Sequence, residues 1–335
     1  MKREKDRVCE VLRQTSRFVV ASHQNIDGDG LGSALAFAFL LRKMGKEAQV
    51  VYDGQIPYFY LFLPGAREVL SYEAFVASFC SFDTLVVVDC SNPGRLGRVE
   101  ELLQKASFVV NVDHHPDNAM FGHANFVDPS SPASALLVYE LLQGMGVALD
   151  ADIAIPILTG IVTDTGGFQF AELNQNMFTI VGELVASGAS LSTIMRHVFR
   201  YRRVEALKLL SRALEHLVFD PSCGCATTYL TQKDFSACHA REEDAEGIVD
   251  YGLYIPEAEV AVFLKEIAPE VYKVSLRSRG NFDVLSVAHH FGGGGHRNAA
   301  GFKMTGSLSL VYETVMGYIK ALVQNTACVG EKREC

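Results

Sequence analysis

The strongest constraint on the fold is a series of short, continuously apolar segments in the first third of the chain. Four of them have the length of a strand and are rich in valine, namely residues 18–21, 49–52, 84–89 and 108–113. A strand that is apolar at every position, rather than at every second one, is buried on both faces of its sheet. Helical patterns at 31–43 and 99–105 alternate with these strands, so we expect a parallel α/β layer fold.

The chain is long enough for two domains. It has 335 residues, and a domain typically takes roughly 100–200. From about Cys225, strands predicted at 225–230, 260–264 and 271–277 alternate with helices in a second, smaller α/β unit. We therefore expect an N-terminal domain at 1–190, a mostly helical linker at 191–218 and a C-terminal domain at 219–328.

Composition limits the classes of partner. The 30 basic and 39 acidic residues give a net charge of −9, whereas proteins that coat long nucleic acids usually present a basic face. The longest apolar run, Ala34–Leu41, is much shorter than the roughly 20 residues of a membrane span. The eight cysteines are scattered, which fits reduced thiols. We expect a cytoplasmic protein that binds neither a membrane nor long duplex DNA.

Acidic and imidazole side chains follow three of the predicted strands and one later predicted helix, which runs into Asp164. The segments that carry them contain His23, Asp27, Asp29, Asp89, Asp113, His114, His115 and Asp164. The carboxyl ends of parallel strands meet at one edge of a sheet, so these segments can converge on one crevice. The four carboxylates at 27, 29, 89 and 164 would repel one another unless cations lie between them, and two divalent ions would balance their charge. Carboxylates mixed with imidazoles suit manganese or magnesium.

Simpler interpretations exist for each motif alone. An aspartate after a strand is commonly a turn or helix-cap residue. A glycine-rich strand–loop–helix can bind a dinucleotide, but Asp27-Gly-Asp29-Gly lacks the G-x-G-x-x-G order and places two acids where a pyrophosphate would lie. The coincidence of several such segments favours a metal site.

Taken together, the motifs resemble the four-motif set of the DHH phosphoesterase superfamily. Residues 291–302, FGGGGHRNAAGF, resemble the signature of the DHH-associated C-terminal domain. The length and two-domain plan are similar to those of the bacterial nanoRNase and pAp phosphatase group. The resemblance implies a parallel-sheet DHH domain, a helical linker and a smaller α/β domain, with the active site in the cleft between the domains.

The resemblance also implies a ligand set for two divalent ions. One ion would be held by His23, Asp27 and Asp89. The other would be held by Asp29, Asp89, His114 and Asp164, so that Asp89 bridges the pair. Mn²⁺ is the favoured ion, with Mg²⁺ and Co²⁺ as alternatives. His115 would be catalytic together with Asp89, donating a hydrogen bond to the phosphoryl or leaving oxygen.

The second domain offers the positive charge that a phosphate needs. The glycine run can present backbone N–H groups to an anion, and arginines lie on either side of it in sequence. The predicted substrate-binding residues are Arg277, Ser278, Arg279, Gly293, Gly294, Gly295, His296 and Arg297. The alternative, a flexible turn flanked by solvated arginines, stays open.

We therefore expect a manganese-dependent phosphodiesterase and exoribonuclease that trims short RNA oligonucleotides to mononucleotides. The same chemistry would make it a 3′(2′),5′-bisphosphate nucleotidase that converts 3′-phosphoadenosine 5′-phosphate (pAp) to AMP. One alternative keeps the chemistry and takes cyclic di-AMP or pApA as substrate, and another is a non-catalytic nucleotide sensor. The expected partners are thus short RNAs or small nucleotides, and a homodimer stays open.

Overall fold

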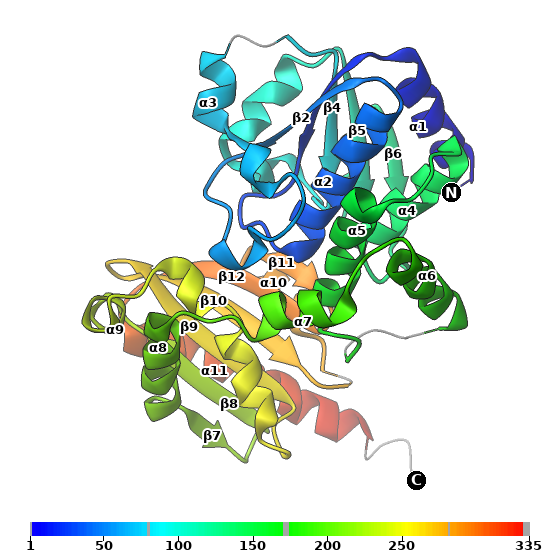
Figure 1. Cartoon of the computed structure of the whole chain (residues 1–335). Coiled ribbons are helices and arrows are strands. Elements are labelled where there is room, and N and C mark those ends of the chain that lie inside the picture. The colour runs from blue at the N-terminus through cyan, green and yellow to red at the C-terminus, as the bar shows by residue number, and fades with distance from the viewer. Residues whose placement is uncertain (1, 79–80, 170–173, 281, 331–335) are drawn as a thin grey trace. The chain divides into compact units, whose positions relative to one another are not determined.

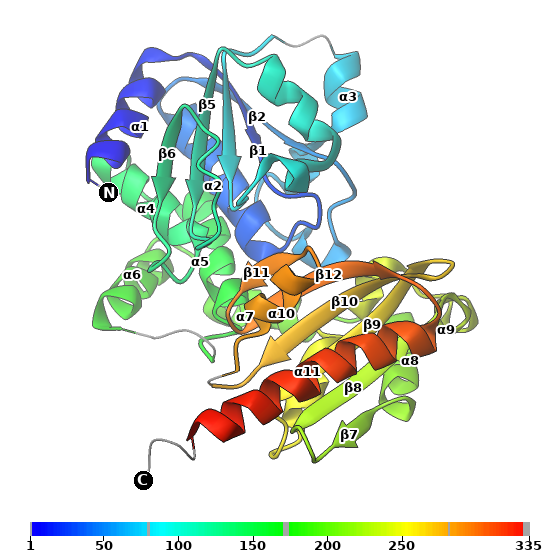
Figure 2. The ribbon, with the colours of Figure 1, turned by 180° about the vertical axis from the view of Figure 1, so that it is seen from behind.

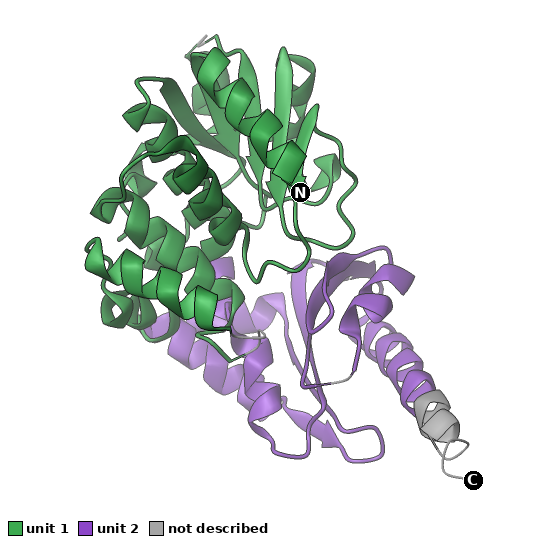
Figure 3. Ribbon diagram, turned by 90° about the vertical axis from the view of Figure 1, so that its right-hand side faces the viewer, with its two compact units in different colours: residues 1–201 green, residues 202–335 purple. Residues whose placement is uncertain are grey.

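A computed structural model describes residues 2–78, 81–169, 174–280 and 282–330, which belong to two compact units (Figure 3). Unit 1 spans residues 1–201 and unit 2 spans residues 202–335. The division lies inside the segment 191–218 that the sequence predicts as a linker. Of the two helices in that segment, α7 (Leu191–Phe199) belongs to unit 1 and α8 (Val204–Glu215) to unit 2.

Unit 1 is built on a six-stranded sheet in the order β3-β2-β1-β4-β5-β6, and every pair of neighbours is parallel. In that order the strands are Leu70–Ser71, Glu47–Tyr52, Arg17–Ala21, Thr84–Val88, Phe108–Asp113 and Ala124–Val127. This confirms the predicted parallel α/β domain. The two outermost strands, β3 and β6, were not predicted, because both are short and neither is a continuous apolar run.

Helices cover both faces of this sheet, which explains the continuous apolar strands. Val20 and Val86 belong to the core formed with α1 (Lys2–Gln14), α2 (Gly28–Lys43), α4 (Ser134–Met145) and α5 (Ala151–Asp164). Their neighbours Val19 and Val87 belong to a second core formed with α3 (Tyr72–Ala77) and η3 (Pro93–Gln104). Figure 1 shows unit 1 with α2 in front of the sheet, and Figure 2 shows it from behind.

The remaining helices of unit 1 are α6 (Gln175–Ala186) and two short 3₁₀ helices, η1 (Tyr58–Tyr60) and η2 (Ala66–Glu68). The helix predicted at 99–105 is part of the 3₁₀ segment η3, whose direction changes at Gly97 (φ 61°, ψ −140°). That backbone conformation is open to glycine and is strained for other residues. The glycine therefore separates η3 into two short turns.

Glycines bring α2 and α5 unusually close together. A Cβ atom at Gly32 would lie 2.4 Å from the carbonyl oxygen of Pro156, and one at Gly28 would lie 2.3 Å from the Thr163 side chain. From the other helix, a Cβ at Gly160 would lie 2.6 Å from an Asp29 oxygen and 2.6 Å from the Ala135 Cβ. This packing sets where the acidic first turn of α2 lies relative to α4 and α5.

Unit 2 contains a six-stranded mixed sheet in the order β11-β12-β10-β9-β8-β7. In that order the strands are Gly294–His296, Ala299–Thr305, Val271–Ser278, Val260–Ala268, Cys225–Leu230 and Val218–Asp220. Among the described strands of this sheet, only β8 and β9 pair in parallel. One face packs against α10 (Val284–His290) and α11 (Leu308–Gly330), and the other against α8, α9 (Gln232–Cys238), η4 (Glu242–Ala245) and η5 (Ile248–Tyr254). Figure 2 shows α11 lying across β8–β10.

Among the residues that the structure describes, no single helix is both long and apolar enough to cross a bilayer. The pair α6 and α7 meets the length and composition criteria only jointly, and the two helices are bent by 101° where they join.

We predict that Gly32→Ala destabilises unit 1, because the added methyl group would overlap the Pro156 carbonyl. Overpacking of this kind costs about 1–3 kcal/mol. Urea unfolding followed by circular dichroism measures the change as a lower midpoint. The matched control is Gly182→Ala in α6, where a Cβ would meet no atom within 4 Å, so helix propensity should leave the midpoint equal or raise it. Equal midpoints for Gly32→Ala and wild type would contradict the packing argument.

Candidate metal and phosphate site

The candidate site of unit 1 lies where the strand order reverses. From β1 the chain runs outward through β2 and β3, and from β4 it runs in the opposite direction through β5 and β6. Ligands of open α/β sheets bind beyond the carboxyl ends of the two strands at such a switch point. His23 and Asp27 follow β1, Asp89 follows β4 directly, and His114 and His115 follow β5.

Asp27 begins helix α2 as its N-cap. Its Oδ1 accepts hydrogen bonds from the backbone N–H groups of Asp29 (3.0 Å) and Gly30 (2.9 Å). Such a cap satisfies N–H groups that have no partner within the helix. One carboxylate oxygen is thus used in the cap, while Oδ2 lies 3.7 Å from His23 Nε2. Asp27 can therefore serve both as the helix cap of the simpler interpretation and as a candidate metal ligand.

Asp29 is fully buried and is held by the beginning of a different helix. Its two oxygens accept hydrogen bonds from the backbone N–H groups of Ser134 (2.6 Å) and Ala135 (2.9 Å), at the N-terminus of α4. The residue at the N-cap position of α4, Ala133, has no side chain that could do this. Asp29 therefore caps α4 from outside, and the partial positive charge at that helix end stabilises its carboxylate.

Ser134 connects this helix end to the next acid. Its hydroxyl donates to Oδ1 of Asp89 at 3.0 Å. Ser134 was not predicted as a site residue, because a serine in the first turn of a helix is common and carries no metal-site signal by itself. Only the convergence of α4 on the loops after β1 and β4 gives it this position.

Asp89 has a strained backbone at the centre of the site. Its φ of 51° lies in the left-handed region, which costs a non-glycine residue about 1–3 kcal/mol and occurs preferentially at functional sites. Its N–H donates to the Val112 carbonyl at 2.9 Å, which ties the turn to β5. The carboxylate is buried, with Oδ2 at 3.4 Å from His23 Nε2 and Oδ1 at 3.6 Å from His114 Nε2.

His114 points its Nε2 at three of the carboxylates. Its Nδ1 lies 2.9 Å from the Ser131 carbonyl oxygen and donates to it. Nε2 lies 3.1 Å from Asp164 Oδ2, 3.6 Å from Asp89 Oδ1 and 3.8 Å from Asp29 Oδ2. A carbonyl that fixes the Nδ1 proton is the usual arrangement of a metal-binding histidine.

The predicted ligands thus form two groups that share Asp89. In the first group, the donor atoms of His23, Asp27 and Asp89 all lie within 4.8 Å of one another. The same is true of Asp29, Asp89 and His114, and Asp164 is in contact with the last of these. In addition, Ser22 Oγ and His23 Nδ1 are buried without a hydrogen-bond partner among the described residues. This donor set, hard oxygens with two imidazoles, fits divalent cations such as Mn²⁺ or Mg²⁺.

The pKa shifts of the buried groups also indicate a site for cations. Burial, reinforced by the carboxylates of Asp89 and Asp164, raises the pKa of Asp29 well above its ordinary value. Burial alone would lower the pKa of His23, but the nearby carboxylates of Asp27 (3.7 Å) and Asp89 (3.4 Å) outweigh burial and raise the pKa to about 9. The crowded carboxylates therefore favour the binding of positive charge, either as protons or as metal ions. Divalent cations at the same place would displace those protons.

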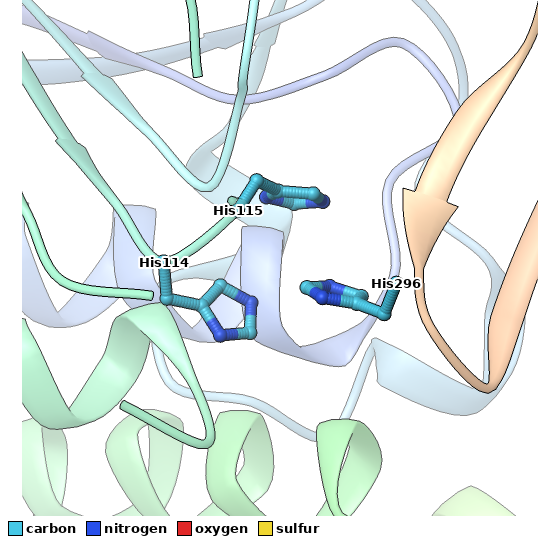
Figure 4. Close-up of side chains that lie close together, drawn as sticks. All are labelled: His114, His115 and His296. Atoms are coloured by element: carbon cyan, nitrogen blue, oxygen red, sulfur yellow. The ribbon is translucent and has the colours of Figure 1, made fainter. Parts of the chain in front are cut away.

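His115 makes a shorter contact with Asp113 than with the shared carboxylate of Asp89. Figure 4 shows His114 and His115 as consecutive side chains; their ring centroids are 5.2 Å apart. Nδ1 of His115 lies 2.7 Å from Asp113 Oδ1, and the other oxygen of Asp113 accepts from the Asn118 amide at 2.6 Å. Donor atoms of Asp113, Asp89 and His115 also lie within 4.8 Å of one another. Because of the hydrogen bonds given above, however, Asp113 orients the ring of His115.

In unit 2, three of the predicted substrate residues are already bound to protein groups. Arg277 Nε lies 3.3 Å from Asp250 Oδ1. Ser278 is buried and its hydroxyl donates to the Phe282 carbonyl at 2.7 Å. Arg279 donates to the carbonyl oxygens of Pro256 (2.9 Å) and Leu253.

The second half of the glycine run 292–295 is strand rather than loop. Gly294, Gly295 and His296 form β11, which pairs with the beginning of β12; His296 is also labelled in Figure 4. A Cβ at Gly293 would lie 2.2 Å from the Gly301 carbonyl oxygen, and one at Gly295 would lie 2.5 Å from that of Ala299. These two glycines are therefore required for strand packing. Arg297 is exposed in the turn that follows.

Comparison with known proteins gives two family matches. Residues 17–161 match the DHH family, N-terminal domain, and residues 235–323 match the DHHA1 domain. The first match includes all the predicted metal ligands except Asp164, which lies three residues beyond its end. The second includes all the predicted substrate residues.

Similar whole proteins and structures are also known. The chain is 36% identical to the bifunctional oligoribonuclease and PAP phosphatase NrnA of Thermus thermophilus, over 93% of this chain and 92% of that one. It is 24% identical to the cyclic-di-AMP phosphodiesterase GdpP of Bacillus subtilis, over 89% of this chain and 46% of that one. The crystal structure of an exopolyphosphatase-related protein from Bacteroides fragilis is similar with a TM-score of 0.88 and 26% identity, covering 97% of this chain and 98% of that one.

We predict that Mn²⁺ raises the melting temperature of the EDTA-treated protein, and that Asp164→Asn reduces this rise. An ion that binds only the folded state stabilises it by about 2.7 kcal/mol at 100 times its Kd. Asparagine keeps the shape of the side chain but removes a charged ligand. The control is Asp152→Asn, an exposed acid at the other end of α5, which should keep the full rise. The same rise in Asp164→Asn as in wild type would remove Asp164 from the ligand set.

Proposed function

The chain belongs to the DHH family, and from that premise we propose that it is a metal-dependent phosphoesterase that hydrolyses short oligoribonucleotides to mononucleotides and pAp to AMP. In both reactions water attacks phosphorus, the bond from phosphorus to a 3′-oxygen breaks, and that oxygen leaves with a proton. The similarity to the NrnA protein of Thermus thermophilus along nearly the full length of both chains supports this choice of substrates.

The observation that carries the proposal is the position of Asp89 in two donor groups at once. Two metal ions that act on one phosphate lie about 3.5–4 Å apart and need a shared ligand. We propose that His23, Asp27 and Asp89 hold one ion. The second would be held by Asp29, Asp89, His114 and Asp164. Such a pair, when bound, supplies an activated water and stabilises the charge that develops on the phosphoryl oxygens.

The protein's own groups fix the geometry for that chemistry. The N-terminus of α4 orients Asp29 through two backbone N–H groups. Ser134 and the strained turn at Asp89 orient the shared carboxylate. Because these groups are held before substrate arrives, little reorganisation is needed during the reaction. Manganese as the working ion, with magnesium and cobalt as alternatives, is part of the proposal.

We further propose that Arg297 and Arg277 of unit 2 bind the part of the substrate that does not react. Arg297 is exposed. Arg277 is half-exposed, and its only carboxylate contact in the described part of the chain is Asp250, whose pKa is raised because it is buried. Arginine binds phosphate with two parallel hydrogen bonds. Ser278, Arg279 and the glycines of β11 would then support this surface rather than touch the substrate.

A second candidate function is hydrolysis of cyclic di-AMP or pApA, and the similarity to GdpP of Bacillus subtilis favours keeping it. A turnover assay with Mn²⁺ on pAp, pApA, cyclic di-AMP and RNAs of increasing length distinguishes the two. Highest kcat/KM on pAp and the shortest RNAs supports the first. No turnover of any of these would favour a sensor instead. The cytoplasmic location, the homodimer and the exclusion of duplex DNA stay predictions from the sequence.

We predict that Asp89→Ala abolishes turnover and weakens metal binding at both positions, because the side chain would serve two ions. Elemental analysis after dialysis measures the metal content directly. Asp83→Ala is the matched control: this acid precedes the same strand at its other end and pairs with Arg17. Two tightly bound manganese ions per chain in Asp89→Ala would refute the bridging role.

We also predict that Arg297→Ala raises KM for pAp or a dinucleotide. The loss of one charged hydrogen bond, ~1.5–3 kcal/mol, corresponds to a roughly 10- to 150-fold increase. Bis-p-nitrophenyl phosphate has no second phosphate or base to bind, so its KM should change much less. Arg241→Ala serves as the control, since Arg241 is exposed in the same unit and pairs with Glu243. An equal rise in KM for both substrates would make the β11–β12 turn structural.

A further inference from the structure

Arg95 is a cation of unit 1 that has no role in the mechanism described so far. Arg95 lies in η3, just after the turn that contains Asp89, and its side chain is half-buried. Its Nη1 is 3.2 Å from Nε2 of His115 and 3.4 Å from Oγ of Ser91. Its backbone carbonyl accepts a hydrogen bond from the N–H of Gln24 at 2.7 Å, in the loop after β1. Arg95 is therefore fixed to the loops after all three central strands.

The contact between Arg95 and His115 indicates which ring nitrogen of the imidazole accepts a hydrogen bond. A guanidinium group can only donate hydrogen bonds, so Nε2 of His115 must accept with its lone pair. The remaining proton is then on Nδ1, which donates to Asp113 at 2.7 Å. In this arrangement His115 has no Nε2 proton to give to a phosphoryl or leaving oxygen. The sequence predicted that His115 donates a hydrogen bond to the phosphoryl or leaving oxygen. In this arrangement another group must donate that bond, and Arg95 is the adjacent donor.

The charge of Arg95 has no counterpart in the described part of the chain. No carboxylate oxygen there lies within 4.0 Å of its guanidinium, whereas three other arginines of the same unit, Arg17, Arg42 and Arg98, each form such an ion pair. The two hydrogen bonds given above use Nη1 only. Nε and Nη2, which together form the planar fork that matches two phosphate oxygens, have no acceptor among the described residues.

The side chain of Arg95 lies close to the proposed metal site. His115 Nδ1 lies 3.8 Å from Oδ1 of Asp89, so one imidazole ring separates Arg95 from the carboxylate shared by both donor groups. An anion in contact with Arg95 would thus lie next to the proposed metal positions. In a phosphoryl transfer, the non-bridging oxygens gain charge in the transition state, and an arginine there stabilises them.

Resting on the proposed function, we propose that Arg95 is a catalytic residue that binds the non-bridging oxygens of the reacting phosphate, and that His115 is a positioning residue that holds Arg95 through Nε2. The ligand class is a phosphate mono- or diester. This assigns the reacting phosphate a cation within unit 1, separate from the arginines of unit 2.

The test uses full-length protein loaded with Mn²⁺ and bis-p-nitrophenyl phosphate, which carries only the reacting phosphate. Arg95→Ala should lower kcat/KM roughly 10- to 150-fold, the worth of one charged hydrogen bond. The same variant should bind inorganic phosphate less tightly, so the inhibition constant of phosphate should rise. Millimolar guanidinium should restore part of the lost rate. The control is Arg98→Ala, three residues along the same segment and bound to Asp53 and Glu73; it should change neither quantity.

A second variant distinguishes the loss of the Arg95 contact with phosphate from damage to the fold or to the metal site. If Arg95→Ala loses manganese or unfolds early, Arg95→Lys is measured instead; this variant keeps the charge but loses the fork, so it should keep its metal content and lose rate. The proposal is overturned if kcat/KM is unchanged in Arg95→Ala. It is also overturned if guanidinium does not restore the lost rate and the manganese content falls in both Arg95→Ala and Arg95→Lys. Because the substrate is not a nucleotide, failure of the wild type on pAp and RNA would refute the proposed function without affecting this test.

His115 is tested separately. His115→Gln keeps a side-chain acceptor for Arg95 but cannot transfer a proton, so it should retain more activity than His115→Ala, and guanidinium should not rescue either. Nitrogen-15 NMR of the histidine rings should show His115 protonated at Nδ1 in the wild type. A ring protonated at Nε2, with equal inactivation by Gln and Ala, would restore His115 as the donor and overturn the positioning role.

Discussion

The site depends on one contact between a helix end and a buried acid. The first two N–H groups of α4 bind the two oxygens of Asp29, and the hydroxyl of Ser134 in the same turn binds Asp89. Without these donors, two buried carboxylates would face each other with little to offset their repulsion. The helix end offers fixed partial positive charge without filling the space between the acids. It thereby keeps the acids together and leaves that space for cations.

The rest of unit 1 makes this contact possible. Helices α2, α4 and α5 approach closely because Gly32 and Gly160 have no side chain. The strand order places the loops after β1 and β4 side by side, and the left-handed turn at Asp89 directs its side chain inward. The same glycines therefore allow the helices to pack closely and determine where the acids lie.

The sequence predicted the parallel sheet and the convergence of His23, Asp89 and His114, because strand ends in a parallel sheet must meet at one edge. It did not predict Ser134 or Arg95. Both are ordinary residues of a helical turn, and they acquire a partner only through three-dimensional packing. For the run 292–295 the sequence left an anion-binding loop and a flexible turn open, and it did not predict that Gly294 and Gly295 form β11. Glycine is disfavoured in strands, so the pairing with β12, which leaves no room for a Cβ, could not be inferred from propensity.

The central claim is that two divalent ions share Asp89 at the switch point of the sheet. Electron paramagnetic resonance of protein loaded with two equivalents of Mn²⁺ tests it most directly, because ions about 3.5–4 Å apart with a common ligand are magnetically coupled. The account predicts the spectrum of an exchange-coupled manganese pair in the wild type. A spectrum of isolated manganese ions only, at full occupancy, would contradict it.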